Sequence, residues 1–172
     1  MEVGINKNPV IYEKQRFLAN ETERITVETD PSVDDPIDEL EIFDLVRNIT
    51  DPEHPLTLEQ LNVLTLDDVS IDLNDRLISV GYTPTVPNCS SGALIGLMIL
   101  AKLKRTVSHY YKVRVFINPG THDLEEAINK QLGDKERVAA AFENGGIIGT
   151  INEKLRTSNE EVDLRKILHL FS

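Results

Sequence analysis

The sequence predicts a small α/β domain, of the α+β kind, in which one three-stranded sheet is covered by helices on one face. Three observations support this fold class. Two short segments alternate apolar and polar residues on either side of a turn, a third such segment follows later, and the stretch between them is apolar nearly all round. Alternation predicts strands with one buried face, and the apolar stretch predicts a buried helix. The expected order is helix, strand, strand, helix, strand, helices.

The first helix is expected to begin at Asp35-Pro36, because Asp can cap a helix and Pro suits its first position. Its apolar stripe is Ile42, Leu45, Val46 and Ile49. The helix should end at Asp51-Pro52, since proline disfavours a helical residue before it. Thr57 and Gln60 then have the spacing of a capping box, which predicts a short turn with Leu58 and Leu61 directed inward.

A β-hairpin is predicted next. Its apolar positions are Val69, Ile71 and Leu73 on the first strand, and Ile78, Val80 and Tyr82 on the second. Residues 83–88 contain two prolines, so they are expected to form a rigid connector that is neither helix nor central strand.

Residues 90–107 are predicted to form the central buried helix. Gly92 and Gly96 have small-residue spacing in it, which favours close packing against the sheet. The third strand follows, with Val113, Val115 and Ile117 alternating, and it should end at 118–120. Cations occur around the end of the helix and along this strand, and they predict a solvated face with a second role in docking an acidic partner: Lys102, Lys104, Arg105, Lys112 and Arg114.

Helices are predicted for the rest of the chain. Thr121 should cap the first, Asp134 should recap a second piece, and Asn144-Gly145-Gly146 should form the C-terminal cap of that piece. A short helix is expected around 147–155. A last amphipathic helix is expected over 162–171.

Three regions follow from these patterns. They are an acidic and flexible tail over 1–35, a folded domain over 36–156, and an amphipathic helical extension over 157–172. The extension is expected to cover the domain's own surface or to meet a partner.

Composition excludes several classes of function. The 172 residues carry 29 acidic and 18 basic side chains, a net charge of −11, and one cysteine. Binding to nucleic acid through a general surface needs clustered cations, so no direct nucleic-acid partner is expected. One cysteine forms no disulfide within the chain, which favours a reducing compartment. No apolar signal core begins the sequence, and no apolar run is long enough to span a bilayer. The cytosol is therefore expected, with the nucleus left open, and no membrane.

Cys89 is the first candidate for chemistry. It stands where the connector enters the buried helix, and backbone N–H groups at a helix N-terminus stabilise a thiolate. The alternative is a small buried hydrophobe, and the residues themselves favour neither. A nucleophilic thiol needs a base, for which His54 and His122 are the candidates.

The second candidate is the polar loop Asp51-Pro52-Glu53-His54. Together with Cys89, its carboxylates and imidazole could supply ligands for iron or zinc. A helix stop with solvated charges is the alternative, and composition favours it, because carboxylates are normally exposed.

Several strings resemble the MIP-eighteen family, which is the cytosolic iron-sulfur assembly component 2 family. They are Asp51-Pro52-Glu53-His54-Pro55-Leu56-Thr57-Leu58, Thr83-Pro84-Thr85, Cys89-Ser90, Pro119-Gly120-Thr121-His122, and the segments 41–47, 94–97 and 129–141. The resemblance covers about 36–155 in the same order. It implies a fold like that of bacterial iron-sulfur assembly proteins.

The resemblance also implies a function. Such a protein is a non-enzymatic subunit of the cytosolic iron-sulfur targeting complex, where it works with a β-propeller subunit and a helical-repeat scaffold to deliver clusters to cytosolic and nuclear apo-proteins. The family is linked to chromosome segregation, and domain-swapped homodimers occur among relatives. Because one chain cannot supply the usual four thiolates, a transient cluster would be shared with partners.

Residue by residue, the family's reactive cysteine matches Cys89, and its Asp-Pro-Glu loop matches Asp51, Pro52 and Glu53. His54 of the same loop and Thr85 of the connector are added as candidate binding residues. Asn88 stands where relatives commonly have His, so no role as base or ligand carries over to that position. A thiol-dependent enzyme that uses Cys89 as its nucleophile is the alternative function. In a third interpretation Cys89 is a packed residue without chemistry.

Overall fold

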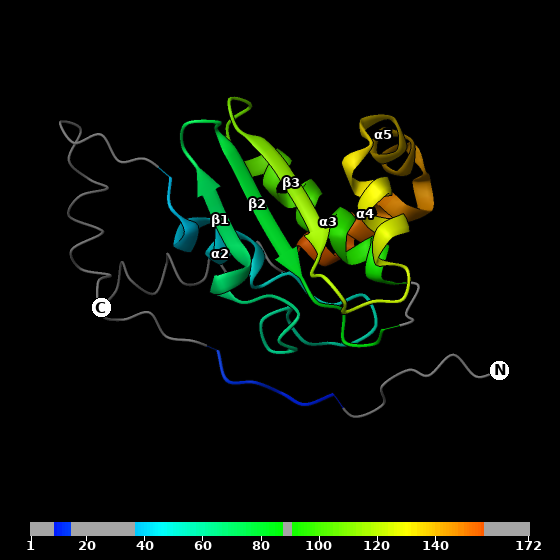
Figure 1. Ribbon diagram of the computed structural model, residues 1–172. Coiled ribbons are helices and arrows are strands. Elements are labelled where there is room, and N and C mark those ends of the chain that lie inside the picture. Colours follow the sequence, from blue (N-terminus) through cyan, green and yellow to red (C-terminus); the bar gives the residue numbers. More distant parts are fainter. Residues whose placement is uncertain (1–8, 15–36, 88–90, 157–172) are drawn as a thin grey trace, which may run out of the picture.

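The computed structural model describes residues 9–14, 37–87 and 91–156 (Figure 1). Its elements, in chain order, are α2 (Glu39–Val46), the 3-10 turn η1 (Leu66–Asp68), β1 (Val69–Asp72), β2 (Leu77–Tyr82), α3 (Ser91–Thr106), β3 (Lys112–Ile117), α4 (Glu125–Gly133), α5 (Lys135–Glu143) and a helix over residues 145–156. The predicted small α/β fold and its order of elements are confirmed. The predicted helix over 162–171 and most of the predicted tail lie outside the described residues.

The sheet has the order β1-β2-β3. β1 pairs antiparallel with β2, and Val69 lies opposite Val80. β2 pairs parallel with β3, and Ile78 lies opposite Val113. A parallel pair needs a crossover connection, and α3 supplies it. The mixed sheet therefore follows from placing a helix between the second and third strands.

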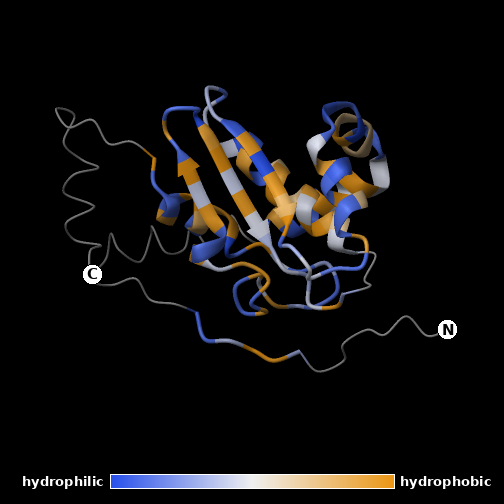
Figure 2. Cartoon of the chain, viewed as in Figure 1, coloured by the Kyte–Doolittle hydropathy of each residue, from blue (hydrophilic) through white to orange (hydrophobic). Residues whose placement is uncertain are grey.

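Helices cover one face of the sheet, as predicted. α2 contacts β1 and α3, while α3 and α4 contact β3. Along the strands, hydrophobic residues alternate with hydrophilic ones (Figure 2). Side chains that point away from the helices are exposed on the other face: Ser70, Asp72, Lys112 and Arg114. In the part of the chain that the structure describes, no helix is long and apolar enough to cross a membrane.

The core lies between the sheet and these helices. Ile78, Val80 and Tyr82 are fully buried, as the alternation predicts. Leu73 was expected in the first strand, but it is 51% exposed and lies beyond β1. The carboxylate of Asp72 accepts the backbone N–H groups of Asn74 and Asp75, so the chain turns before Leu73 can pair.

The first helix begins later than predicted, at Glu39. Asp38 and Glu41 form a capping box in which each side chain accepts the other residue's backbone N–H, at 2.9 and 3.0 Å. This reciprocal pair satisfies two N–H groups at the start of α2, and residues 37 and 38 are not helical. The predicted start at Asp35-Pro36 is therefore wrong, and those two residues lie outside the described ranges. The second predicted capping box, Thr57 with Gln60, is confirmed.

The fourth helix also begins later than predicted. Thr121 caps no helix, because its hydroxyl donates to the carbonyl of Asn118 (2.7 Å). Glu125, the first residue of α4, instead accepts the N–H of Gly120 (2.6 Å). The loop before α4 thus satisfies its own polar groups.

Of the last two predicted caps, the one at Asp134 is confirmed and the one at Asn144-Gly145-Gly146 is wrong. Asp134 caps α5 by accepting from Glu136 and Arg137, as predicted. Asn144 ends α5, but the glycines after it form no C-terminal cap. The side chain of Asn144 accepts the N–H groups of Gly146 and Ile147, so these residues open the helix over 145–156.

Lys102 does not belong to the predicted solvated face, because it is only 8% exposed. It follows the fully buried Met98 and Ile99 by four and three residues, which places it on the core-facing side of α3. The other four cations of that group are exposed.

Tyr82 of β2 contacts α3 at the two glycines of that helix. The hydroxyl of Tyr82 donates to the carbonyl of Gly92 (2.7 Å). A Cβ atom at Gly96 would lie 2.6 Å from the Tyr82 hydroxyl and 2.5 Å from Leu132 Cδ1. The predicted close packing against the sheet is confirmed for Gly96, whereas a Cβ atom at Gly92 would meet His122 and Ile128, which lie outside the sheet.

We predict that Gly96→Ala lowers the free energy of unfolding by ~1–3 kcal/mol, because β2 and α4 must both move to admit the methyl group. The matched control is Gly149→Ala. Gly149 is an exposed helical position with nothing near its Cβ position, so the change should stabilise by ~0.5–1 kcal/mol. Urea unfolding measures both. Equal effects of the two substitutions would contradict the packing argument.

Candidate functional site

The candidate site lies where β2 and β3 end, at the bottom of the view in Figure 1. Parallel strands place their carboxyl ends at one edge of a sheet, and loops meet there. The backbone N–H of Asp123, in the loop after β3, donates to the carbonyl of Pro87 in the connector after β2 (2.8 Å). The connector is irregular, as predicted, and Thr85 is half-buried within it.

Asn118 holds this edge together, and sequence reasoning assigned it only to a turn. Its side-chain amide donates to Asp68 Oδ1 (2.7 Å) and to Thr83 Oγ1 (3.0 Å), which links η1 with the ends of β2 and β3. A Cβ atom at Gly81 would collide with Asn118 Oδ1. The Asn-Pro-Gly string gave a turn signal, but these contacts come from residues far away in the sequence.

His122 is the histidine that the structure brings to the start of α3. Its side chain is 6% exposed, and its Nδ1 accepts the N–H of Leu124 (3.0 Å). A neutral ring with Nδ1 as acceptor carries its proton on Nε2. Nε2 lies 3.2 Å from the Cβ position of Gly92, in the first turn of α3.

Both flanks of residues 88–90 are thus anchored. Pro87 is bonded to the loop after β3, and Gly92 is bonded to Tyr82. Burial raises the pKa of Tyr82 well above its ordinary value, so its hydroxyl stays protonated and remains a donor. Cys89 and Asn88 lie outside the described residues.

The loop over 51–57 is closed by its own hydrogen bonds. Thr50 and Thr57 form an isolated antiparallel bridge, and the N–H of Asp51 donates to the carbonyl of Leu56 (2.9 Å). Asp51 Oδ1 accepts the backbone N–H groups of Glu53 (2.8 Å) and His54 (2.9 Å). The carboxylate of Asp51 therefore fixes the turn that carries the next three residues.

This loop is not the exposed helix stop that composition favours. Asp51 is 2% exposed and His54 is 8% exposed, while Glu53 points to solvent and Pro52 is half-buried. Burial raises the pKa of Asp51, and the two backbone donors oppose that shift. His54 Nε2 is buried with no hydrogen-bond partner among the described residues.

The predicted metal ligands are Asp51, Glu53 and His54 together with Cys89. Over 9–14, 37–87 and 91–156, no group of three or more His, Cys, Asp or Glu side chains is arranged to hold a metal ion. Since Cys89 lies outside these ranges, the complete ligand set stays a prediction.

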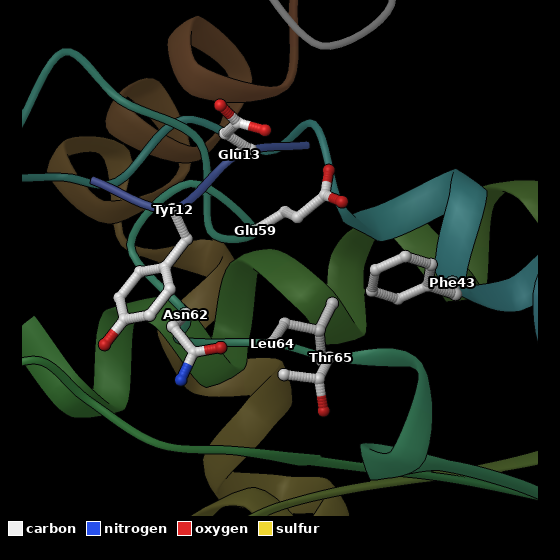
Figure 3. Close-up of a pocket in the computed structure, with 7 residues that line it drawn as sticks. All are labelled: Tyr12, Glu13, Phe43, Glu59, Asn62, Leu64 and Thr65. Atoms are coloured by element: carbon white, nitrogen blue, oxygen red, sulfur yellow. The ribbon is translucent and has the colours of Figure 1, made fainter. Parts of the chain in front are cut away.

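A second feature of the molecule was not visible in the sequence. The guanidinium of Arg47 forms two hydrogen bonds to the carboxylate of Glu59, at 2.8 and 2.6 Å, and both side chains are 5% exposed. The N–H of Tyr12 donates to the carbonyl of Gln60 (2.8 Å), which holds residues 9–14 beside this pair. A pocket of about 130 Å³ opens there (Figure 3), lined by Tyr12, Glu13, Phe43, Glu59, Asn62, Leu64 and Thr65.

Comparison with known proteins gives relatives at close to half identity. A MIP18 family protein of Caenorhabditis elegans is 51% identical over 153 residues, which is 88% of this chain and 94% of that protein. The cytosolic iron-sulfur assembly component 2B of Mus musculus is 48% identical over 150 residues, 87% of this chain and 90% of that protein. The protein of the same name in Dictyostelium discoideum is 50% identical over 154 residues, 85% of this chain and 93% of that protein. A scan against protein-family models finds no match.

We predict that Asp51→Ala lowers the free energy of unfolding by ~2 kcal/mol, because two backbone donors lose their acceptor in a buried turn. Asp72→Ala is the matched control. Its carboxylate also accepts two backbone N–H groups, but in an exposed turn where water replaces it, so the loss should stay below ~1 kcal/mol. Thermal or urea unfolding compares the variants. A larger loss for the control would contradict the buried turn.

Asp51 also gives a prediction of pH dependence. Because its folded-state pKa is raised above the ordinary value of 3.8, its contribution to stability is greatest at low pH. That contribution is lost as pH rises through the folded-state pKa. Asp51→Asn keeps an oxygen acceptor and does not titrate. Urea unfolding at a series of pH values should therefore show the wild type losing stability relative to Asp51→Asn as pH rises. A difference that is constant, or that grows in favour of the wild type, would contradict the shift.

Proposed function

The chain belongs to the MIP18 family, and we propose that it acts as an adaptor subunit of the complex that delivers iron-sulfur clusters in the cytosol. Its role in cytosolic iron-sulfur protein assembly rests on one observation. Over most of its length the chain is about half identical to proteins named cytosolic iron-sulfur assembly component 2B. These names point to an assembly component rather than an enzyme, and to the cytosol.

The finer parts of the proposal concern partners. A β-propeller subunit and a helical-repeat scaffold are the proposed neighbours in the complex, and apo-proteins of the cytosol and nucleus are the proposed clients. A link to chromosome segregation would follow from such nuclear clients. We assign the assembly domain to 36–156, with 1–35 as a tail and 157–172 as an extension. One core cluster that includes buried residues from Ile42 to Leu155 supports the central part of that division.

Cys89 is the proposed reactive position. Its support is the anchoring of both flanks, because Pro87 and Gly92 are bonded to different parts of the core. α3 is 16 residues long, and the N-terminus of such a helix favours a thiolate over a thiol. A cluster would be cargo in transit. One thiolate per chain means that partners, or a second copy in a domain-swapped dimer, would supply the remaining ligands.

The loop of Asp51, Pro52, Glu53 and His54, together with Thr85 of the connector, is the proposed binding element. The carboxylate of Asp51 accepts two backbone N–H groups of the turn, so Asp51 positions the loop rather than contacting a partner. Glu53 is exposed on the surface of this loop. The buried His54 Nε2 is a donor or acceptor without a partner in the described part of the molecule.

A thiol-dependent enzyme is the second candidate function. The position of His122 favours this function. Of the two candidate bases, His122 is the one whose imidazole lies against Gly92 in the first turn of α3. An isolated chain with such activity would form a covalent intermediate and turn over without the other subunits. If the purified chain formed no covalent intermediate under single-turnover conditions, the enzyme function would be contradicted.

We predict that Cys89→Ala fails to restore cluster delivery. Cells depleted of their own assembly component 2 would be complemented with the wild type, Cys89→Ala, or the control Gly149→Ala, and the activity of a cytosolic iron-sulfur enzyme would be measured. The control should match the wild type, because Gly149 is exposed and lies far from any packed neighbour. Cys89→Ala at equal abundance should lose most of the activity.

Two outcomes of this experiment would contradict parts of the proposal. Full activity with Cys89→Ala would remove the thiol from the mechanism but leave the adaptor role. Full activity in cells without any version of the protein would overturn the proposed function. Affinity capture of the wild-type chain should also recover a β-propeller protein and a helical-repeat protein together.

A further inference from the structure

The end of the sheet opposite the candidate site carries a cluster of exposed cations in an otherwise acidic protein. They come from the turn before β2, the last turn of α3 and the first half of β3: Arg76, Lys104, Arg105, Lys112 and Arg114. The backbone N–H of Lys112 donates to the carbonyl of Arg76 (2.7 Å), so the turn and the strand adjoin. No ion pair joins these five side chains to any residue that the structure describes. The net charge of the whole chain is −11, which makes this local positive surface unusual within it.

β3 is an edge strand, and its hydrogen bonds define which backbone groups face outward. Lys112 and Asn118 donate their N–H groups toward β2, to Arg76 and Tyr82. Alternate residues of a strand bond to opposite sides, so Val113, Val115 and Ile117 direct theirs away from β2.

Among the described residues, one end of this edge is covered and the other is not. The side chain of Asn129, on α4, accepts the N–H of Ile117 (2.7 Å) and donates to its carbonyl (3.3 Å). The outward N–H and C=O groups of Val113 and Val115 have no hydrogen-bond partner among the described residues. Four outward backbone groups at the other end therefore lack a hydrogen-bond partner among the described residues. The exposed cations lie at this same end.

The side chains along this open edge alternate between the core face and the uncovered face of the sheet. Val113 and Val115 pack against the core, while Lys112 and Arg114 extend from the uncovered face of the sheet. The guanidinium of Arg114 lies over the ring of Phe116 (5.3 Å to the centroid), which holds it on that face. Lys112 and Arg114 thus lie on either side of Val113, and Arg114 also precedes Val115.

Cations on an edge strand also discourage two copies of a chain from pairing edge to edge. Here a second copy would bring its own Lys112 and Arg114 to the same face, and like charges opposite each other destabilise a pair of strands. A strand with carboxylates would be attracted by the same side chains. The charges therefore select among strands rather than exclude all of them.

We propose that the open edge of β3 receives an extended acidic segment of a partner protein as a fourth strand. Its main chain bonds to Val113 and Val115, and its carboxylates at positions i and i+2 meet Lys112 and Arg114. The spacing of two follows from strand geometry, because alternate side chains share one face. This interaction surface lies away from the loops that hold the candidate site, and the proposal does not depend on the role in cluster delivery.

The test uses the full chain and two synthetic peptides of one composition. In the first, Glu alternates with Val and Thr; in the second, the Glu residues are consecutive. Binding is measured by titration, and amide hydrogen exchange is followed by NMR. The alternating peptide should slow exchange at Val113 and Val115 by about tenfold or more at saturation, because both amides acquire acceptors. The consecutive peptide should bind more weakly and leave these amides unprotected.

Matched variants separate strand addition from general attraction. Lys112→Glu with Arg114→Glu should weaken binding of the alternating peptide by about tenfold or more. Lys104→Glu with Arg105→Glu makes the same charge change on α3, outside the strand, and should cost less than about threefold at physiological salt. Val113→Pro removes one outward N–H without removing a β2–β3 hydrogen bond, and it should also weaken binding.

Three results of the peptide experiments would overturn the proposal. They are equal affinity for the two peptides, equal losses from the two double variants, and bound peptide without protection of Val113 and Val115. Protection of these amides before any peptide is added would do the same, because it would mean that another segment of the chain already covers the edge.

Discussion

The whole arrangement depends on how the Tyr82 side chain, at the end of β2, contacts the start of α3. Tyr82 is fully buried at the end of the central strand, and its hydroxyl fits against the start of the helix because Gly96 carries no side chain. A buried hydroxyl without a partner would cost free energy, so the bond to the carbonyl of Gly92 also makes the burial of Tyr82 tolerable. The strand end and the helix start are thereby held in one position.

That contact positions the candidate site. The connector between β2 and α3 begins at a strand end fixed by Asn118 and finishes at a helix start fixed by Tyr82. His122 packs at the same helix start from the loop after β3. The site is thus assembled from three connections that meet at one edge of a parallel pair of strands, with Cys89 proposed at its centre. The opposite end of the same pair presents the cations and the open edge, so the two proposed surfaces are well separated.

Much of the fold could be predicted because it is encoded locally. The alternation around Val80 and Tyr82, the capping box of Thr57 with Gln60, and the cap at Asp134 all involve residues a few positions apart. The errors arose where several local solutions compete. The first helix is capped by Asp38 with Glu41 and not by Asp35. The side chain of Asn144 caps the helix that follows α5, whereas the glycines after it were expected to end α5.

Features of the candidate site were less predictable because they depend on distant residues. The burial of Asp51 and His54 follows from a bridge between Thr50 and Thr57 and from packing that the local sequence does not reveal. Asn118 and the Arg47–Glu59 pair were missed for the same reason. The family resemblance supplied the function and agreed with the choice of Cys89, which its place before a helix had already indicated, and the relatives at about half identity confirm the family. The central claim is that the closely packed start of α3 activates this thiol. Because the chain has one cysteine, the rate of alkylation of the folded protein against pH measures it directly. The account predicts a pKa below that of a free thiol, and a shift back toward it in Tyr82→Phe; an ordinary or raised thiol pKa in the wild type would contradict it.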